Sequence, residues 1–184
     1  QPAIDACAPG DTVLVGPGTY TGPANRNLDC HGVDLVLISD SGRDMTIINC
    51  QRDGRGVYLH SGETAAATIA GITITNGLID GRGAGAYIQN ASCTIKDARI
   101  SAGEALYGGG LLFSYSPESR VEHTEIMDNG PSYSGGGFSC GDSNVDFVSV
   151  LFQGNASAEG GGGRIIRSDV SFSDVQFLLN RATA

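Results

Sequence analysis

One stretch of the chain concentrates residue types that bind ions and sugars. Asp53 and Arg55 precede a short apolar run, and His60 and Glu63 follow it. If that run is a strand, the four side chains lie at its two ends, where a carboxylate beside an arginine can bind Ca²⁺ or an acidic sugar. We take these residues as a candidate binding site. An ordered transition from an irregular N-terminal part to a regular array is the alternative that explains them without a ligand.

Tyrosines beside this stretch offer a surface for ring stacking. Tyr58, Tyr87 and then Leu112 stand at corresponding positions next to glycine-rich segments and are expected to point outward. Aromatic faces on a flat sheet bind sugar rings or another protein. Tyr58 and Tyr87 therefore join the candidate binding site, while a row that only stacks on itself is the alternative.

A hydrolytic triad is a further interpretation. His123 shares one column of the sequence with Asp97, Ser149 and Asp174. Such a column at a bend has no strained nucleophile turn and no oxyanion donors. We expect these residues to form a solvated bend.

The net charge of the chain limits the classes of partner that it can bind. The 184 residues include 20 acidic and 11 basic side chains, which give a formal net charge of −9. No basic stripe is present to release counterions from a phosphate backbone, so we expect no nucleic-acid partner. Because no apolar run reaches about 18 residues, we also predict no transmembrane segment.

The candidate residues can be placed because the chain repeats itself about every 26 residues. Two apolar columns keep this spacing, and a glycine cluster opens each unit. The first column is Ile48, Ile74, Ile100, Ile126, Phe152 and Phe177, and the second is Ile69, Ile95, Val121, Phe147 and Phe172. This period indicates a solenoid whose units bury their apolar faces against neighbouring units.

The make-up of one unit favours strands. Gly, Ser, Thr and Asn are frequent, and short runs alternate with period two. We predict three strands in a unit, such as 111–113, 120–122 and 125–127. The predicted fold class is all-β, a right-handed parallel β-helix (solenoid) with about 26 residues per coil and a short N-terminal helical cap within residues 2–8.

We expect one β-helix domain over residues 1–184, with the cap and first irregular coils in 1–50 and regular coils in 51–184. The sequence stops where the next glycine triplet is due. We therefore expect a fragment of a longer chain, or self-association through the C-terminal coil, since an uncovered solenoid end recruits partners.

The bends and the cysteines also follow the repeat. Asparagine tolerates a left-handed backbone and can bond to the next coil, so four residues are predicted to close their units at equivalent bends: Asn76, Asn129, Asn155 and Asn180. Cys93 and Cys140 fall at inward positions and should be free thiols, whereas Cys7 and Cys30 either pair or stay free. Without a Cys-X-X-Cys pair we predict no metal centre and no cofactor, Ca²⁺ at the candidate site excepted.

Two sets of residues resemble known proteins. The segment 9–20, Pro-Gly-Asp-Thr-Val-Leu-Val-Gly-Pro-Gly-Thr-Tyr, is similar to the N-terminal cap of pectin-lyase-like right-handed β-helix proteins. The units that open with Gly-Gly-Gly and end in Asn resemble the GGGI/FxxN repeats of polymorphic outer-membrane proteins and other surface proteins. The resemblance implies a secreted or cell-surface module without catalytic activity, which binds carbohydrate or a surface partner, or displays and spaces other domains.

The same resemblance includes polysaccharide lyases and glycoside hydrolases that act on acidic polysaccharides. Some lyases of this fold use a lysine and an arginine on adjacent coils, which here points to Lys96 and Arg99, with Glu125 nearby. The repeat gives these residues a structural alternative, because a shift of one coil brings opposite charges side by side: Lys96 with Glu122, Arg99 with Glu125, and Arg120 with Asp146.

Overall fold

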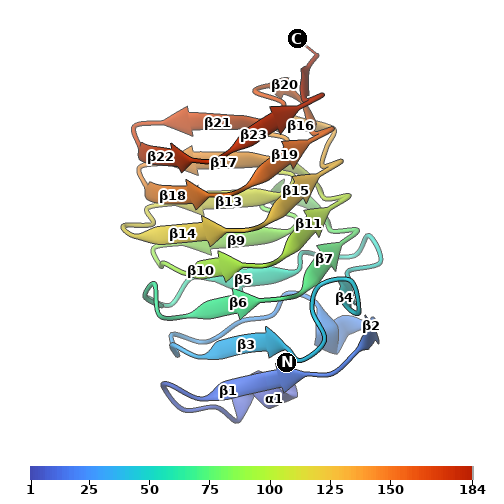
Figure 1. Ribbon diagram of the computed structural model, residues 1–184, viewed down its shortest axis with the longest axis vertical. Coiled ribbons are helices and arrows are strands. Elements are labelled where there is room, and N and C mark those ends of the chain that lie inside the picture. The colour runs from blue at the N-terminus through green and yellow to red at the C-terminus, as the bar shows by residue number, and fades with distance from the viewer. Residues whose placement is uncertain (184) are drawn as a thin grey trace.

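The chain winds into stacked coils in which each strand pairs in parallel with the strand one coil further on (Figure 1). The computed structural model describes residues 1–183. The blue N-terminal coil lies at one end of the stack and the red C-terminal coil at the other (Figure 1). The predicted all-β parallel solenoid is confirmed.

Sheets A and B contain seven strands each. Sheet A comprises β1 (Thr12–Val15), β3 (Val36–Ser39), β6 (Thr68–Ala70), β10 (Thr94–Lys96), β14 (Ser119–Glu122), β18 (Asn144–Val148) and β22 (Asp169–Ser173). Sheet B comprises β2 (Gly18–Tyr20), β4 (Thr46–Asn49), β7 (Thr73–Thr75), β11 (Arg99–Ser101), β15 (Glu125–Met127), β19 (Leu151–Gln153) and β23 (Gln176–Leu178).

Sheets C and D contain five strands each and begin one or two coils later. Sheet C comprises β5 (Val57–Leu59), β9 (Ala86–Gln89), β13 (Leu111–Ser114), β17 (Phe138–Gly141) and β21 (Gly163–Ile166). Sheet D comprises β8 (Leu78–Arg82), β12 (Glu104–Tyr107), β16 (Ser132–Ser134), β20 (Ala156–Glu159) and β24 (Arg181–Ala182).

A regular coil thus has four strands, and the prediction of three is wrong. The missed strand is the one in sheet D, for example Ser132–Ser134. Its outward side chain, Tyr133, is large and its inward ones, Ser132 and Ser134, are small and polar, so the usual apolar alternation is inverted. Glycine and proline next to it favoured a turn.

From β6 onward, each bend between the sheets has a residue with a left-handed backbone at an equivalent position. The bend from A to B has Gly71, Asp97, His123, Ser149 and Asp174, and the bend from B to D has Asn76, Ala102, Asp128, Gly154 and Leu179. The bend from D to C has Gly83, Gly108, Gly135 and Gly160, and the bend from C to A has Asn90, Tyr115, Asp142 and Arg167. The His123 column is therefore a structural bend, as predicted.

Glycine is required at the bend from D to C. Gly135 has φ +67°, and a Cβ added there would collide with the carbonyl oxygen of Phe138 and the side chain of Ser139. The neighbouring Gly110 cannot carry a Cβ either, because the carbonyl oxygen of Gly137 on the next coil lies too close. The glycine clusters therefore permit both a tight bend and close stacking.

An asparagine ladder follows the bend from B to D. The Asn129 Nδ2 donates to Asn155 Oδ1 at 2.9 Å and to the carbonyl of Ile100 at 3.0 Å, and Asn155 repeats the pattern toward Asn180. These three residues lie one position after the left-handed residue. Asn76 lies at the same bend, one position earlier: it occupies the left-handed position itself, with φ 57°, and its Nδ2 donates to Asn49 Oδ1 at 3.2 Å.

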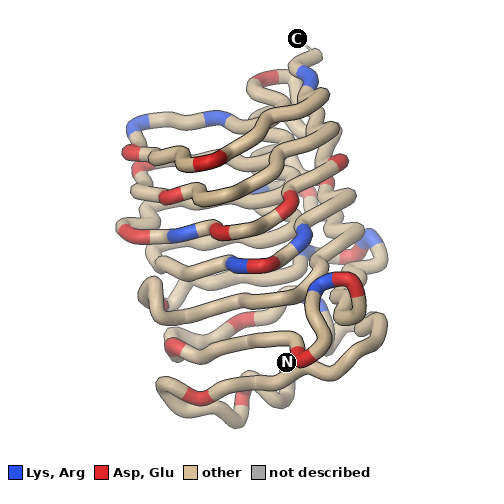
Figure 2. The backbone as a smooth tube through the Cα atoms, in the orientation of Figure 1, with Lys and Arg blue, Asp and Glu red and all other residues tan. Residues whose placement is uncertain are grey.

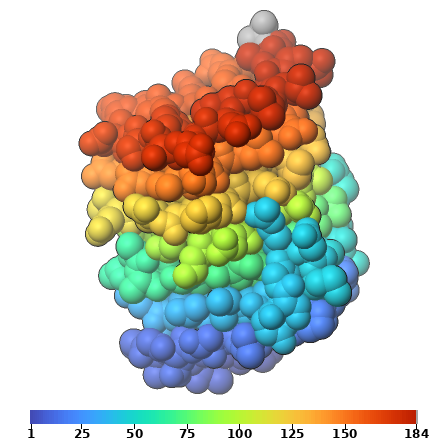
Figure 3. Space-filling view, viewed as in Figure 1, coloured from blue at the N-terminus to red at the C-terminus, as the bar shows by residue number. Residues whose placement is uncertain are grey.

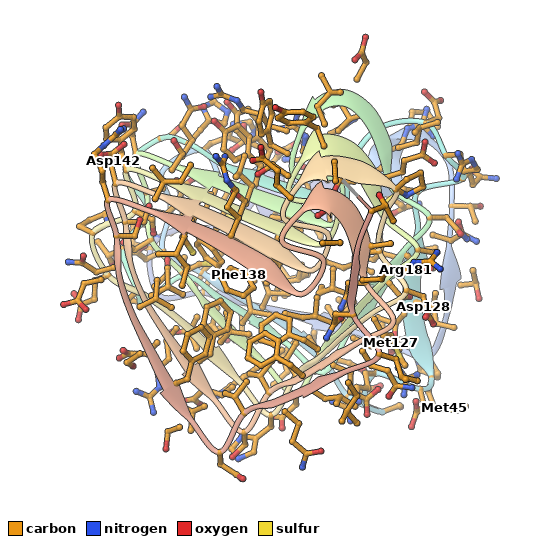
Figure 4. The ribbon with its side chains drawn as sticks, turned by 90° about the horizontal axis from the view of Figure 1, so that it is seen from above. Met45, Met127, Asp128, Phe138, Asp142 and Arg181 are labelled. Carbon is orange, nitrogen blue, oxygen red and sulfur yellow. The ribbon has the colours of Figure 1, made fainter. Side chains whose placement is uncertain are left out.

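The two apolar columns form the core between sheets A, B and C. Figure 4, seen from above, shows Phe138 of sheet C pointing into the space between them. The column members are buried in every coil that another coil covers, whereas Phe172 and Phe177 in the last coil are 43% and 48% exposed. Cys93 and Cys140 are buried free thiols, as predicted, and burial raises the pKa of both.

The N-terminal end has the expected short helix. α1 (Pro2–Asp5) lies beside β1 and buries Ile4 (Figure 1). A 3₁₀ turn, Pro23–Asn25, follows β2. Cys7 and Cys30 are both free thiols, so of the two alternatives the structure has the unpaired one.

The predicted register between coils is confirmed. Lys96 is opposite Glu122, Arg99 opposite Glu125, and Arg120 opposite Asp146. Arg99 and Glu125 form an ion pair at 2.7 Å and Arg120 and Asp146 one at 3.8 Å. Arg120 also pairs with Glu122 of its own strand.

The covered core positions should dominate the stability. We expect Ile100→Ala to reduce the free energy of unfolding by about 2–5 kcal/mol, because a fully buried side chain leaves a cavity between two coils. Leu179→Ala removes a side chain that is 85% exposed and should change it by less than about 0.5 kcal/mol. Equal losses in urea denaturation would contradict the burial of the column.

Candidate functional site

The outer face of sheet C forms the floor of a groove that runs along the solenoid. Five outward residues lie in register on its successive strands: Tyr58, Tyr87, Leu112, Ser139 and Arg164. Figure 4 shows side chains crowded on this face, between the corner that holds Asp142 and the projecting strands of sheet D. We call this surface the C-face groove.

The groove is recessed rather than flat. Tyr87 and Leu112 point away from the core but are only 5% and 6% exposed, because neighbouring side chains cover them. A hollow of about 320 Å³ continues over the later strands, lined by Arg82, Tyr107, Leu112, Tyr115, Asp142 and Arg164, among others. The outward row was predicted, but its depth was not.

Arg55 lies on two stacked tyrosines at the N-terminal end of the groove. The rings of Tyr58 and Tyr87 are 5.1 Å apart, and the Arg55 guanidinium carbon lies 4.5 Å from the first and 5.3 Å from the second. His60 stacks on the Tyr58 ring at 4.1 Å. Cation–π contact of this kind stabilises a guanidinium by about 0.5–2 kcal/mol.

The Arg55 guanidinium has donors left over. Its Nη1 atom is buried and has no hydrogen-bond partner, and no ion pair of Arg55 occurs within residues 1–183. Burial lowers the pKa of Arg55, while the two tyrosines act in the opposite direction. A buried cationic donor without an acceptor is costly, and stacking on the two tyrosines is the contact that offsets this cost for Arg55.

Arg82 extends the basic side of the groove. Its guanidinium carbon lies 5.9 Å from the Tyr107 ring, and a hydrogen bond to Tyr87 raises the pKa of Arg82. Tyr58 donates its hydroxyl to Gln89 Oε1 at 2.7 Å, and burial raises the pKa of Tyr58. Tyr58 is therefore held in place by a hydrogen bond as well as by stacking.

The C-terminal end of the groove holds two ion pairs. Arg164 contacts Glu159 at 3.1 Å, and Arg167 binds both carboxylate oxygens of Asp142 at 2.7 Å each. The hydrogen bonds from Arg167 lower the pKa of Asp142. Both arginines are thus neutralised locally, unlike Arg55 and Arg82.

The structure separates the predicted binding residues into two groups. Arg55, Tyr58, Tyr87 and His60 come together at the groove. Asp53 instead pairs with Arg26. Glu63 is buried and accepts hydrogen bonds from the backbone N–H groups of Gly32 and Ser61 at 2.8 and 2.9 Å.

The role of Glu63 is thus to join two coils, and both of its carboxylate oxygens accept hydrogen bonds.

The predicted Ca²⁺ site has no matching cluster of ligands. His60 contacts Asp29 at 3.1 Å. Across the described residues, no three His, Cys, Asp or Glu side chains gather as a metal site would require. Ca²⁺ at this place stays a prediction without a geometric counterpart.

The alternative catalytic residues lie on another side of the solenoid. Lys96 is in sheet A, whereas Arg99 and Glu125 are in sheet B beyond the bend at Asp97. The loop between β3 and β4, residues 40–45, rises across the coils and covers this region; it carries adjacent basic and acidic residues (Figures 2 and 3). We call it the 40–45 loop.

The 40–45 loop binds the ionic groups of sheet B. Arg43 donates to Glu125 at 2.7 Å and to the carbonyl oxygens of Ala98 and His123 at 3.1 and 2.8 Å. Arg99 donates to Glu125 at 2.7 Å and to Asp44 at 2.8 Å. Arg99 and Glu125 are therefore joined in a four-residue ionic network, and Lys96 makes no ion pair in the described part of the chain.

Sequence reasoning missed Arg82, Tyr107, Arg164 and Arg43. The first two belong to sheet D, whose strands were not predicted, and Arg164 closes the row that began with Tyr58. A signal for the row existed, because one further coil beyond Leu112 leads to Ser139 and then to Arg164. Nothing in the repeat could indicate Arg43, which acts from a loop over coils about 55 to 82 residues away.

Fold and groove together define a parallel β-solenoid with an arginine- and tyrosine-lined outer face. The family model described as "Right handed beta helix region" matches residues 29–181. The chain therefore belongs to the right-handed β-helix family, which also supports the predicted hand of the coil. No curated protein and no solved structure matches the chain significantly. Among the described residues no helix is long and apolar enough to cross a membrane.

The ionic network should stabilise the solenoid more than an isolated surface pair does. We expect Arg43→Ala to cost about 1–2 kcal/mol of unfolding free energy, because three hydrogen bonds are lost and Glu125 keeps only Arg99. Arg52→Ala, which breaks an exposed pair with Glu104, should cost at most about 0.5 kcal/mol.

Urea denaturation compares the two variants, and limited proteolysis of the 40–45 loop gives a second readout. Faster cleavage of that loop is expected in Arg43→Ala alone. Identical stabilities and cleavage rates in both variants would show that the network has no stabilising role.

Proposed function

We propose that this protein is a secreted or cell-surface β-helix module that binds carbohydrate through the C-face groove and has no catalytic activity of its own. The fold is consistent with carbohydrate-related or surface roles. The observation that carries the proposal is the guanidinium of Arg55, which lies on the stacked rings of Tyr58 and Tyr87 and makes no ion pair within the described residues. Aromatic rings beside fixed donors suit sugar faces and hydroxyl oxygens.

The geometry of the groove favours binding over display alone. A module that only spaces other domains needs length and solubility, but it has no use for a recessed row of tyrosines that holds a guanidinium without a counter-charge. The recess also suits a chain-like ligand better than a flat protein surface. Display and spacing remain compatible with binding, because the groove occupies one side of the coils only.

Carbohydrate binding is tested with a panel of immobilised neutral and acidic polysaccharides. Tyr58→Ala should reduce the affinity for the polysaccharide that binds most tightly by about ten-fold, because the stacking surface and the support of Arg55 are lost together. Tyr20→Ala removes a tyrosine of sheet B, outside the groove, and is the matched control. Retention of full affinity by folded Tyr58→Ala would place binding elsewhere.

The competing function is a polysaccharide lyase or hydrolase that uses Lys96, Arg99 and Glu125. The engagement of Arg99 and Glu125 with the 40–45 loop argues against it, because a catalytic acid or base needs access to the substrate. We expect no unsaturated uronic product from pectate or alginate in an ultraviolet assay with added Ca²⁺. Turnover that is lost in Lys96→Ala or Arg99→Ala would favour the enzyme instead.

A further inference from the structure

Two segments of the chain have the Asn-X-Ser pattern at which a glycan is attached to the asparagine of a secreted protein. They are Asn90-Ala91-Ser92 and Asn155-Ala156-Ser157. Because the two tripeptides are identical, the sequence alone gives no reason to prefer one of them. The structure distinguishes them, since the two asparagines occupy different positions of the coil.

Asn155 has no room and no free amide hydrogen for a glycan in the folded protein. Its side chain is fully buried. Its Nδ2 atom donates both hydrogens, to the carbonyl oxygen of Ile126 at 2.8 Å and to Asn180 Oδ1 at 2.9 Å. Its Oδ1 atom accepts hydrogen bonds from the backbone N–H and the Nδ2 of Asn129. A sugar on Nδ2 would replace one of these hydrogens and separate coils that are in contact.

Asn90 has the opposite surroundings. It is exposed, and its side chain makes no hydrogen bond within residues 1–183. Its backbone N–H donates to the carbonyl oxygen of Ser114 on the next coil at 3.0 Å, so the backbone of the bend is fixed without the side chain. Both hydrogens of the Asn90 amide are therefore available for substitution.

The bend from sheet C to sheet A also leaves room for a bulky group. Asn90, Tyr115, Asp142 and Arg167 stand above one another along this corner of the solenoid. Figure 4 shows Asp142 at an outer corner of the coil. Tyr115 and Arg167 are exposed, as Asn90 is. A glycan on Asn90 would extend into solvent without displacing a neighbouring coil.

We propose that Asn90 is an N-glycosylation site and that Asn155 is not. The donor is an oligosaccharide linked to a lipid through diphosphate, used by a transferase of the secretory pathway. The Nδ2 atom of Asn90 attacks the anomeric carbon as the bond from that carbon to the diphosphate oxygen breaks. One amide hydrogen leaves as a proton, and the lipid diphosphate is the leaving group. This inference rests on the proposed secreted or cell-surface location and is independent of binding at the C-face groove.

The contacts of Ser92 set the time of the transfer. Its hydroxyl, which belongs to the recognised pattern, is buried and accepts a hydrogen bond from the backbone N–H of Glu118 at 3.1 Å. The transfer to Asn90 therefore precedes the stacking of the next coil. A glycan added to Asn155 at the same stage would prevent the asparagine ladder from forming, so molecules modified there would not fold.

The site is tested by expressing the full chain, behind a cleavable secretory leader, in a eukaryotic host that attaches N-glycans. Secreted, folded protein should carry a single glycan. Peptide N-glycosidase removes it, and peptide mass spectrometry then locates the site at Asn90 as an aspartate. Absence of secreted, folded protein with a glycan on Asn90, or a glycan on Asn155 in that protein, would overturn the proposal. Polysaccharide binding is measured separately with unglycosylated protein from a bacterial host, so either proposal can fail without the other.

Two variants assign the glycan to one of the two patterns. Asn90→Asp should abolish it and keep the left-handed bend, because Asp142 has the same conformation at the equivalent position. This variant is chemically identical to enzymatically deglycosylated wild type, so the two thermal melts should coincide. Ser157→Ala disrupts the other pattern while the Asn155 side chain is kept, and it should leave the glycan in place. A glycan that persists in Asn90→Asp, or is lost in Ser157→Ala, would show that Asn90 is not the acceptor.

Discussion

The structure depends on one constraint, which is that every coil must return to the same place above the previous one. A single residue with a left-handed backbone at each of the four bends meets this constraint, and the bends fall into columns along the stack. Because these positions repeat, the backbone of each coil can hydrogen-bond to the next over all four sheets. Apolar columns, the asparagine ladder and the C-face groove are all consequences of that constant path, since each is a row of equivalent positions.

The sequence allowed prediction of the rows in which one type of side chain, apolar or charged, recurs in every coil. Ile100 and Val121 mark the core columns, and Arg99 and Glu125 mark the register, because inward apolar and outward charged positions recur with the coil. The strands of sheet D were not predicted because their pattern is inverted: the small polar residues Ser132 and Ser134 point inward, and the large residue Tyr133 points outward. Asn76 lies at the predicted bend but one position before the other three asparagines, because asparagine serves two adjacent columns, one for its backbone and one for its side chain.

The candidate site was predictable only in part. Tyr58 and Tyr87 could be found from their column, and Arg55 from its place beside them. The partners that give these residues their character could not, because Arg82 and Tyr107 reach the groove from sheet D. In the sequence, Asp53 and Glu63 were candidates for the same binding site as Arg55. In the structure, however, Asp53 pairs with Arg26, and Glu63 accepts hydrogen bonds from two backbone amides. A one-dimensional repeat does not encode which outward side chain bends toward which neighbour.

The 40–45 loop changes how the solenoid can unfold. In a stack whose coils contact only their neighbours, opening can begin at either end and proceed coil by coil. Arg43 breaks that rule, since its guanidinium joins the coil of β4 to carbonyl and carboxylate groups of residues 55 to 82 positions later in the chain. We expect this link to couple the coils from β4 to β15 more tightly than stacking alone does, so that the coils beyond β15 open first. Partial unfolding would therefore separate the C-terminal end of the groove, with Arg164, from the end that holds Arg55.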